Sequence, residues 1–150
     1  MGSRRVRQDA REASFELEFG PERMLEIVEV PFDVPAVAEM VRVRYHVTSM
    51  GHGRCTVDLG LADPRGVRGW SGSERREVFV RADTATPGYR PGPLAAGRWA
   101  VLLGLYELPA EGCRVVVHVE VGLRHRRWLP GDLHVHTYHS SDSRMTPVEI

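Results

Sequence analysis

The residue types that could do chemistry are concentrated in one short stretch, GDLHVHTYHSSDS, at residues 131–143. The segment from Asp132 to Thr137 alternates like a short strand, so Asp132, His134 and His136 are expected to project from one face. Side chains two apart on a strand begin about 6.5 Å apart, which lets two imidazoles converge on one metal ion. Asp132 is placed either to orient a ligating histidine or to ligate directly.

The polar loop after this strand supplies two further candidate ligands, His139 and Asp142. A His-x-His pair alone is weak evidence, because such pairs also occur as two histidines on a solvated strand face. The neighbouring loop favours the metal-site interpretation over that alternative. The sequence therefore predicts metal ligation by His134, His136 and Asp142, with His139 as an additional candidate and Asp132 as their supporting carboxylate.

A helix start follows the loop. Thr146 is an N-cap residue, Pro147 suits the first helical position, and Glu149 stands three residues after the cap. The sequence ends at Ile150, and a single further residue cannot nucleate a helix. We therefore expect the chain to be a fragment of a longer protein, which lacks the rest of a strand–loop–helix unit.

The elements before residue 124 have the period-two alternation of half-buried strands. The first expected strand starts at Ser14. Clear alternation predicts further strands at 41–47, 55–61 and 113–121. Additional strand candidates are Met24 to Val30, Glu77 to Arg81 and Trp99 to Tyr106. Turn residues separate these segments. No helical stretch is evident before Met145. Seven or eight short strands predict a mainly β fold, a β-sandwich of jelly-roll-like type.

Two segments between the strands are ambiguous. Residues 82–97 form a long loop rich in proline and glycine, which is either a crossover between two sheets or a functional loop. Residues 69–73 resemble a nucleophile elbow, but Ser73 stands where the motif needs glycine, so we interpret them as a turn. Cys55 and Cys113 fall in alternating apolar segments and are expected to be small core side chains.

Composition excludes several classes of protein. The formal net charge of zero disfavours nucleic-acid binding, and no apolar run is long enough to span a membrane. The basic start lacks the apolar core of a secretory signal, so a cytoplasmic location is expected. The basic run of residues 124–127 is interpreted as a solvated linker, although it could contact a phosphate. The expected organisation is a disordered N-terminus (1–13), a β-sandwich (14–123), a linker (124–130) and the start of a metallohydrolase domain (131–150).

The segment from Asp132 to Ile150 resembles motif one of the PHP (polymerase and histidinol phosphatase) domain. That motif commonly runs D-L-H-x-H-T-x-x-S-D-G, followed by a T-P-x-E-like helix start. The Gly-Asp before the first histidine and the β-rich region upstream are similar to the CehA/McbA branch of PHP metallohydrolases. The segments from Leu59 to Gly72 and from Ala85 to Leu94 also resemble the N-terminal region of that branch. The resemblance thus extends from about Phe15 to the end, and the last twenty residues are its most specific part.

This resemblance implies a distorted (β/α)₇ barrel that binds two or three divalent metal ions such as Zn, Mn or Fe. His134 and His136 match the paired ligands of the first barrel strand. Asp142 matches the motif's aspartate, but an extra serine precedes it here, and His139 falls at a variable position. The later motifs that complete the site are absent. The implied chemistry is metal-assisted hydrolysis of a small-molecule phosphoester or related ester.

Two hypotheses follow. In the first, the chain is the N-terminal part of a PHP-type metal-dependent hydrolase, its sandwich packs on the missing barrel, and the chain alone is inactive because it lacks most metal ligands. In the second, it is a stand-alone β-sandwich binding module that uses the loop 82–97 and carries a vestigial metal-motif tail.

Overall fold

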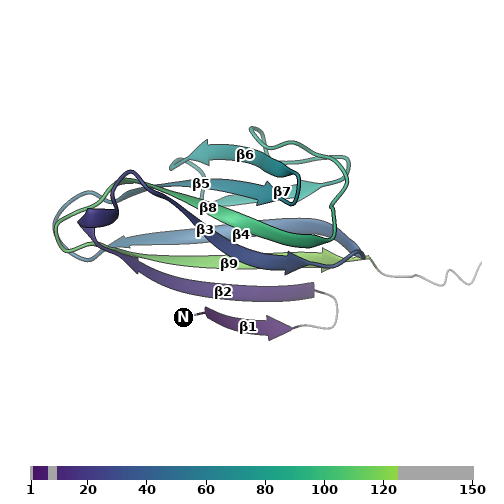
Figure 1. Cartoon of the computed structure of the whole chain (residues 1–150), viewed down its shortest axis with the longest axis horizontal. Helices are drawn as coiled ribbons and strands as arrows, with labels where there is room; N and C mark the ends of the chain where they lie inside the picture. Colours follow the sequence, from purple (N-terminus) through teal and green to yellow (C-terminus); the bar gives the residue numbers. More distant parts are fainter. Residues whose placement is uncertain (1, 7–9, 125–150) are drawn as a thin grey trace, which may run out of the picture.

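The computed structural model describes residues 2–6 and 10–124, which are mainly β (Figure 1). The elements are β1 (Gly2–Val6), β2 (Ala10–Phe19), the 3₁₀ turn η1 (Pro21–Arg23), β3 (Ile27–Val34), β4 (Ala38–Ser49), β5 (Thr56–Asp63), β6 (Gly66–Gly72), β7 (Glu77–Arg81), β8 (Gly97–Glu107) and β9 (Cys113–Leu123). In this part of the chain, no helix is long and apolar enough to cross a membrane.

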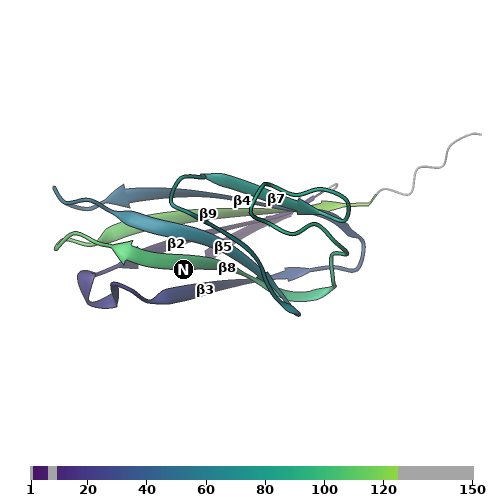
Figure 2. The same ribbon diagram turned by 90° about the horizontal axis from the view of Figure 1, so that it is seen from above.

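Two antiparallel sheets pack face to face as a sandwich. One sheet has the order β2-β9-β4-β7, with β1 added at the outer edge of β2, and the other has the order β3-β8-β5-β6. The strands of both sheets run along the long axis of the domain (Figure 2). From β2 to β5, successive strands alternate between the two sheets, so each connection crosses from one layer to the other.

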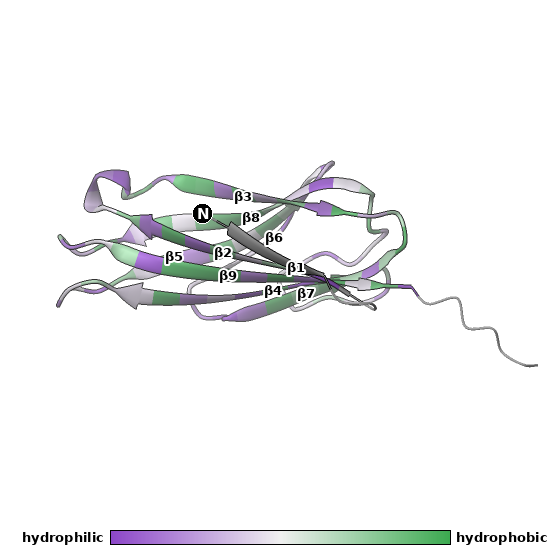
Figure 3. Cartoon of the chain, turned by 90° about the horizontal axis from the view of Figure 1, so that it is seen from below, coloured by the Kyte–Doolittle hydropathy of each residue, from purple (hydrophilic) through white to green (hydrophobic). Residues whose placement is uncertain are grey.

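The alternation in the sequence produces the core. Hydrophobic and hydrophilic residues succeed one another along the strands (Figure 3). On β9, the valines from Val115 to Val121 that share one parity are at most 2% exposed, whereas Arg114 and His118 on the other parity are exposed. The same division holds on β4, where Val41 and Val43 are fully buried. The expected β-sandwich, its alternating strands and the strand from Glu77 to Arg81 are confirmed.

Two expectations about local structure were wrong, and both concern edge strands. The strand expected from Met24 to Val30 instead runs from Ile27 to Val34 and continues through Pro31. Proline lacks a donor for the ladder, but an edge strand such as β3 tolerates it. The segment 69–73 was interpreted as a turn, yet Gly66–Gly72 forms β6, which pairs with β5 through two register shifts. Irregular pairing is common at sheet edges.

The sandwich begins earlier than its expected start at residue 14. Strand β2 begins at Ala10, because its whole length from Ala10 to Phe19 pairs with β9, and β1 pairs in turn with β2. The long loop before Gly97 joins β7 in one sheet to β8 in the other, so it is a crossover between the sheets.

Candidate functional site

The sequence-predicted metal residues cannot be placed in this fold. Asp132, His134, His136, His139 and Asp142 all lie outside the described residues, and so does the expected linker beyond Arg124. Within residues 2–6 and 10–124, no group of three or more His, Cys, Asp or Glu side chains is arranged to hold a metal ion. The metal centre therefore stays a prediction from the motif.

A serine–histidine pair lies on the outer face of the sheet β1-β2-β9-β4-β7. Ser14 on β2 and His118 on β9 are directly opposite each other, and Ser14 Oγ is hydrogen-bonded to His118 Nδ1. A nucleophile beside a base is the beginning of a hydrolytic triad, which also needs a third group that orients the histidine. Among the described residues, His118 has no carboxylate partner, so this pair is a cross-strand surface contact.

The outer face of the sheet β3-β8-β5-β6 carries a groove, and the indole of Trp70 is its main feature. Trp70 on β6 lies across two glycines of neighbouring strands, Gly60 on β5 and Gly104 on β8. A Cβ atom at Gly60 would lie 2.4 Å from Trp70 Cε3, and one at Gly104 would lie 2.7 Å from Trp70 Cζ2. Glycine is therefore required at both positions for the indole to lie against the sheet. Trp70 nevertheless stays 38% exposed.

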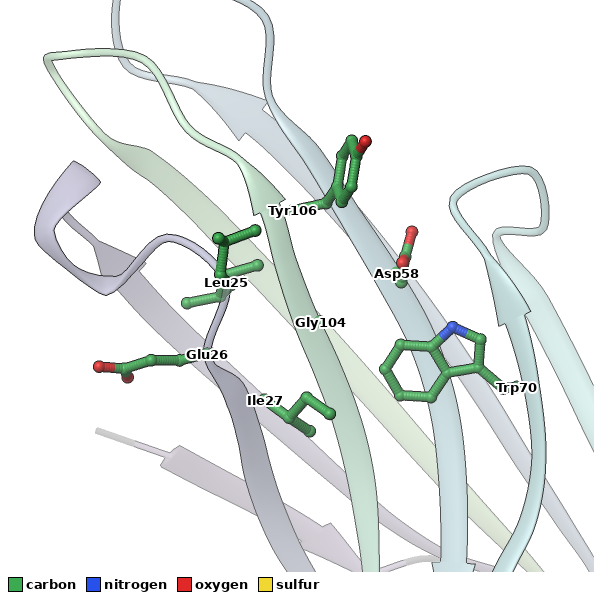
Figure 4. A pocket seen from close by; sticks show the side chains of 8 residues that line it. Leu25, Glu26, Ile27, Asp58, Trp70, Gly104 and Tyr106 are labelled. Atoms are coloured by element: carbon green, nitrogen blue, oxygen red, sulfur yellow. The ribbon is translucent and has the colours of Figure 1, made fainter.

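The groove runs along β8, with Gly104 as its floor (Figure 4). Leu25 and Ile27 line one side, Asp58 and Trp70 line the other, and Tyr106 lies further along β8. Its volume is about 140 Å³. Pockets for drug-sized ligands occupy about 300–1,000 Å³, so this groove suits a side chain or a head group.

The rim of the groove contains a strained residue. Leu25 has φ 70°, which makes it the one non-glycine residue with positive φ in the described part of the chain. Its N–H donates to the Leu105 carbonyl at 2.6 Å, and the N–H of Leu105 donates to the Glu26 carbonyl at 2.9 Å. These two bonds hold the left-handed conformation, which costs about 1–3 kcal/mol for such a residue. The side chain of Leu25 is 76% exposed as a result.

The charge pattern of the groove is one-sided. The carboxylates of Glu26 and Asp58 line it, and no basic residue does. Glu26 accepts a hydrogen bond from Arg23 Nε at 2.8 Å and is thereby neutralised. Asp58 has no hydrogen-bond or ion-pair partner within the described residues. An uncompensated carboxylate thus stands beside an exposed indole.

The two outer faces of the sandwich differ in character. On the first sheet, exposed ion pairs span neighbouring strands: Arg114 on β9 contacts both Glu16 (3.3 Å) and Glu18 (2.8 Å) on β2. On the second sheet, large apolar side chains occupy outward positions, with Ile27 64% and Tyr106 62% exposed. Contiguous exposed apolar surface next to polar groups marks interaction sites. The second outer face is therefore the better candidate for function.

A buried ion pair organises the opposite part of this sheet. The side chains of Arg68 on β6 and Asp63 on β5 are 7% and 5% exposed, and Arg68 Nη1 lies 3.0 Å from Asp63 Oδ2. Arg68 also donates hydrogen bonds of 2.9–3.2 Å to three carbonyls of the crossover loop, those of Arg90, Gly92 and Pro93. The arginine thus fastens the loop to the sheet. This explains why the loop is a rigid crossover.

The pKa of Asp63 follows from that arrangement. Burial alone would raise the pKa of this carboxyl, but the hydrogen bonds from Arg68 and from the backbone N–H groups of Arg65 and Gly66 outweigh it. The pKa of Asp63 is consequently lower than its ordinary value. Its ionised form stabilises the fold at neutral pH.

The two cysteines lie in or against the core, as expected. Cys113 is fully buried at the start of β9, Cys55 packs against the core just before β5, and both are free thiols. Burial raises the pKa of Cys113 to about 12, and burial also raises the pKa of Cys55. Since the thiolate is the reactive form, neither side chain is prepared for nucleophilic chemistry.

These pKa shifts predict slow alkylation of the native chain. With its pKa near 12, Cys113 is about 10⁻⁴ thiolate at pH 8. We expect iodoacetamide at pH 8 to modify Cys113 at least about 100-fold more slowly in the folded chain than in urea, by mass spectrometry of peptides. Because the folded pKa exceeds the unfolded value of 9.0, the stability gained from this thiol is lost as the pH rises from 9 towards 12. Equal rates in the two states would contradict the assignment.

Sequence reasoning missed the groove because the segment around Trp70 was interpreted as a turn. A signal was present in the strand that became β8. Leu102 and Tyr106 have the opposite parity to Val101, Leu103 and Leu105, so both faces of that strand carry large apolar residues. A strand with one solvated face does not show this pattern.

No protein-family model matches this chain, and no curated protein matches it.

Proposed function

We propose that this chain is the N-terminal part of a PHP-type metal-dependent hydrolase of the CehA/McbA-like branch, acting on a small-molecule phosphoester or related ester. The single observation that carries the proposal is the motif from Asp132 to Thr137 with its following loop and helix start. In this proposal, His134, His136 and Asp142 bind a divalent metal ion, and His139 and Asp132 assist them.

The fold agrees with the β-rich domain that the resemblance implies upstream of the motif. In this proposal the sandwich is a double-sheet jelly roll, and the two orders β2-β9-β4-β7 and β3-β8-β5-β6, with connections that cross between the sheets, support this assignment. Its last strand ends at Leu123, ahead of the motif that begins at Asp132. This order supports a β domain that packs beside a barrel.

The donor set fits a transition metal. Two neutral imidazoles and a carboxylate suit Zn²⁺, Mn²⁺ or Fe²⁺, and a site with open positions keeps water. When bound, such ions lower the pKa of a coordinated water and polarise an ester or phosphoryl oxygen. The role of this chain's histidines is to hold the ion, for which each imidazole must be neutral.

A metal titration tests the ligand assignment. We expect the 150-residue chain to bind Zn²⁺ or Mn²⁺ in isothermal titration calorimetry, and the double variant His134→Ala/His136→Ala to lose at least about tenfold in affinity. The matched control is His46→Ala/His52→Ala, which removes two exposed histidines of the sandwich and should bind as the unaltered chain does. Equal binding by both double variants, or no binding by the unaltered chain, would overturn the assignment.

A second arm tests the hydrolase itself. Source DNA read beyond codon 150 should continue in frame with further His, Asp and Glu motifs, and its product should hydrolyse a generic phosphoester with Mn²⁺ or Zn²⁺. The 150-residue chain should show no hydrolysis under the same conditions. Hydrolysis by the 150-residue chain alone, or an inactive metal-loaded longer product, contradicts the proposal.

A second candidate function is a β-sandwich binding module. The observation that favours it is the groove beside Trp70, on an outer sheet face with large exposed apolar side chains. The crossover loop, by contrast, is fastened by Arg68 and has a structural role. Failure of the metal titration would place this candidate first.

A further inference from the structure

We propose that the groove on the outer face of the sheet β3-β8-β5-β6 binds the quaternary ammonium group of a free small molecule, with Trp70 and Asp58 as the recognising residues. This inference does not depend on the metal motif, because every residue involved lies in the described sandwich. Three features of the groove carry it: a supported aromatic platform, an uncompensated carboxylate, and a size that matches a head group.

The aromatic platform, the indole of Trp70, is in place before a ligand binds. Gly60 and Gly104 let one face of the Trp70 indole lie on the sheet, so its orientation is fixed before any ligand arrives. The opposite face of the ring is open to solvent and its edge borders the groove, so a cation would rest on the outward face of the indole (Figure 4). The face of an indole carries negative electrostatic potential and attracts cations more strongly than other aromatic rings do.

Charge decides between a cationic and a neutral ligand. Asp58 stands on β5 next to Gly104 and Trp70, with no described cation paired to it. A positive group in the groove would meet both the carboxylate and the indole, and these two attractions act in the same direction. A neutral ligand gains only the apolar contact, and an anionic one is repelled.

The remaining walls select a methylated cation. Leu25 and Ile27 present apolar side chains opposite Trp70, and these cannot accept hydrogen bonds from an ammonium group. Methyl groups on the nitrogen gain apolar contact with these side chains, and the positive charge still faces Asp58. The groove volume of about 140 Å³ holds one head group, and we assign a free small molecule as its occupant.

Choline and its neutral carbon isostere, 3,3-dimethyl-1-butanol, test the role of charge. We titrate each into the ¹⁵N-labelled chain and follow the indole N–H signal of Trp70, which is identified by its absence in Trp70→Ala. Choline should bind with a dissociation constant on the order of 1 mM, and at least about tenfold tighter than the isostere. Added 0.5 M NaCl should weaken choline binding and leave the isostere unchanged.

Variants identify the recognising groups. Asp58→Asn should lower choline affinity about fivefold to tenfold without changing the affinity for the isostere, and Trp70→Leu should lower both. The matched control is Asp83→Asn, which removes an equal charge from an exposed position in the crossover loop and should bind as the unaltered chain does. Unchanged amide spectra elsewhere show that each variant is folded.

Several outcomes overturn the inference. Equal affinity for choline and the isostere would make the groove merely apolar, and no binding of either at 50 mM would remove the site. An equal loss of choline affinity in Asp58→Asn and Asp83→Asn would indicate that the overall charge of the chain attracts choline, rather than Asp58 in particular. Binding to phosphatidylcholine vesicles without binding of free choline would replace the free ligand with a membrane surface.

Discussion

Replacing Arg68 by methionine should destabilise the domain by about 3–5 kcal/mol, the usual cost of leaving a buried charge without its partner. The side chains of Arg68 and Asp63 are almost fully buried, so water cannot solvate the Asp63 carboxylate once the guanidinium is gone. The loop carbonyls of Arg90, Gly92 and Pro93 lose their donors at the same time. The measurement is urea unfolding at pH 7, followed by circular dichroism.

Three companion variants separate the causes. Asp63→Asn should cost less, about 1–3 kcal/mol, because the buried guanidinium of Arg68 keeps its hydrogen bonds to three loop carbonyls. The double variant should cost less than the sum of the two single variants, since the residues form one unit. Arg114→Met removes an arginine whose ion pairs with Glu16 and Glu18 are exposed, and it should leave the midpoint nearly unchanged. An Arg68→Met midpoint as high as that of Arg114→Met would refute the role of the buried pair.

The ion pair of Arg68 and Asp63 also predicts how the stability of the domain falls at acidic pH. The folded pKa of Asp63 is lower than its unfolded value, which is about 3.9 for a free aspartate. A carboxyl of this kind stabilises the fold above the unfolded pKa, and its contribution is lost as the pH falls through the lower folded pKa. Asp63→Asn has no such group, so its unfolding free energy should fall less steeply below pH 4.

Trp99→Ala should cost about 3–5 kcal/mol, the range for truncating a fully buried large aromatic residue. Trp99 is 1% exposed on the central strand β8, its Nε1 donates to the Ala95 carbonyl at 2.8 Å, and its ring lies 6.4 Å from that of Phe32. The Arg68 guanidinium carbon lies 5.5 Å from the ring centroid. Truncation therefore leaves a cavity and also weakens the support of the buried ion pair.

Trp70→Ala is the matched control, because it removes the same residue type from the other side of the same sheet. Trp70 is 38% exposed, so its loss should cost less, on the order of 1–2 kcal/mol. Trp99→Phe keeps most of the ring but loses the indole N–H, and it should fall between the two. A Trp70→Ala variant that is less stable than Trp99→Ala would mean that the outer face contributes more to folding than the core.

The strands with one buried face could be predicted from the sequence, because the signal is local. The side chains of β4, β5 and β9 alternate between core and solvent, and the expected segments 41–47, 55–61 and 113–121 all fall within or overlap these strands. The edge strands were harder to predict. The strand expected from Met24 to Val30 runs on through Pro31 to Val34, and the segment 69–73 lies mostly in β6 rather than in a turn. Only the position of a strand within its sheet decides whether proline is tolerated in it.

The period-two pattern, and with it a β-sandwich, is predictable from the sequence, whereas the resemblance of Asp132 to Thr137 to a metal-binding motif stays a prediction. The roles of Arg68 and Trp70 emerge only in the folded chain. The residues near Arg68 in the sequence do not indicate that it donates hydrogen bonds to carbonyls at residues 90–93. Likewise, the residues near Trp70 do not indicate that its indole lies over a glycine of β8. The physical reason is that alternation arises within one strand, whereas burial of a charge and support of an indole depend on strands that the chain brings together from far apart.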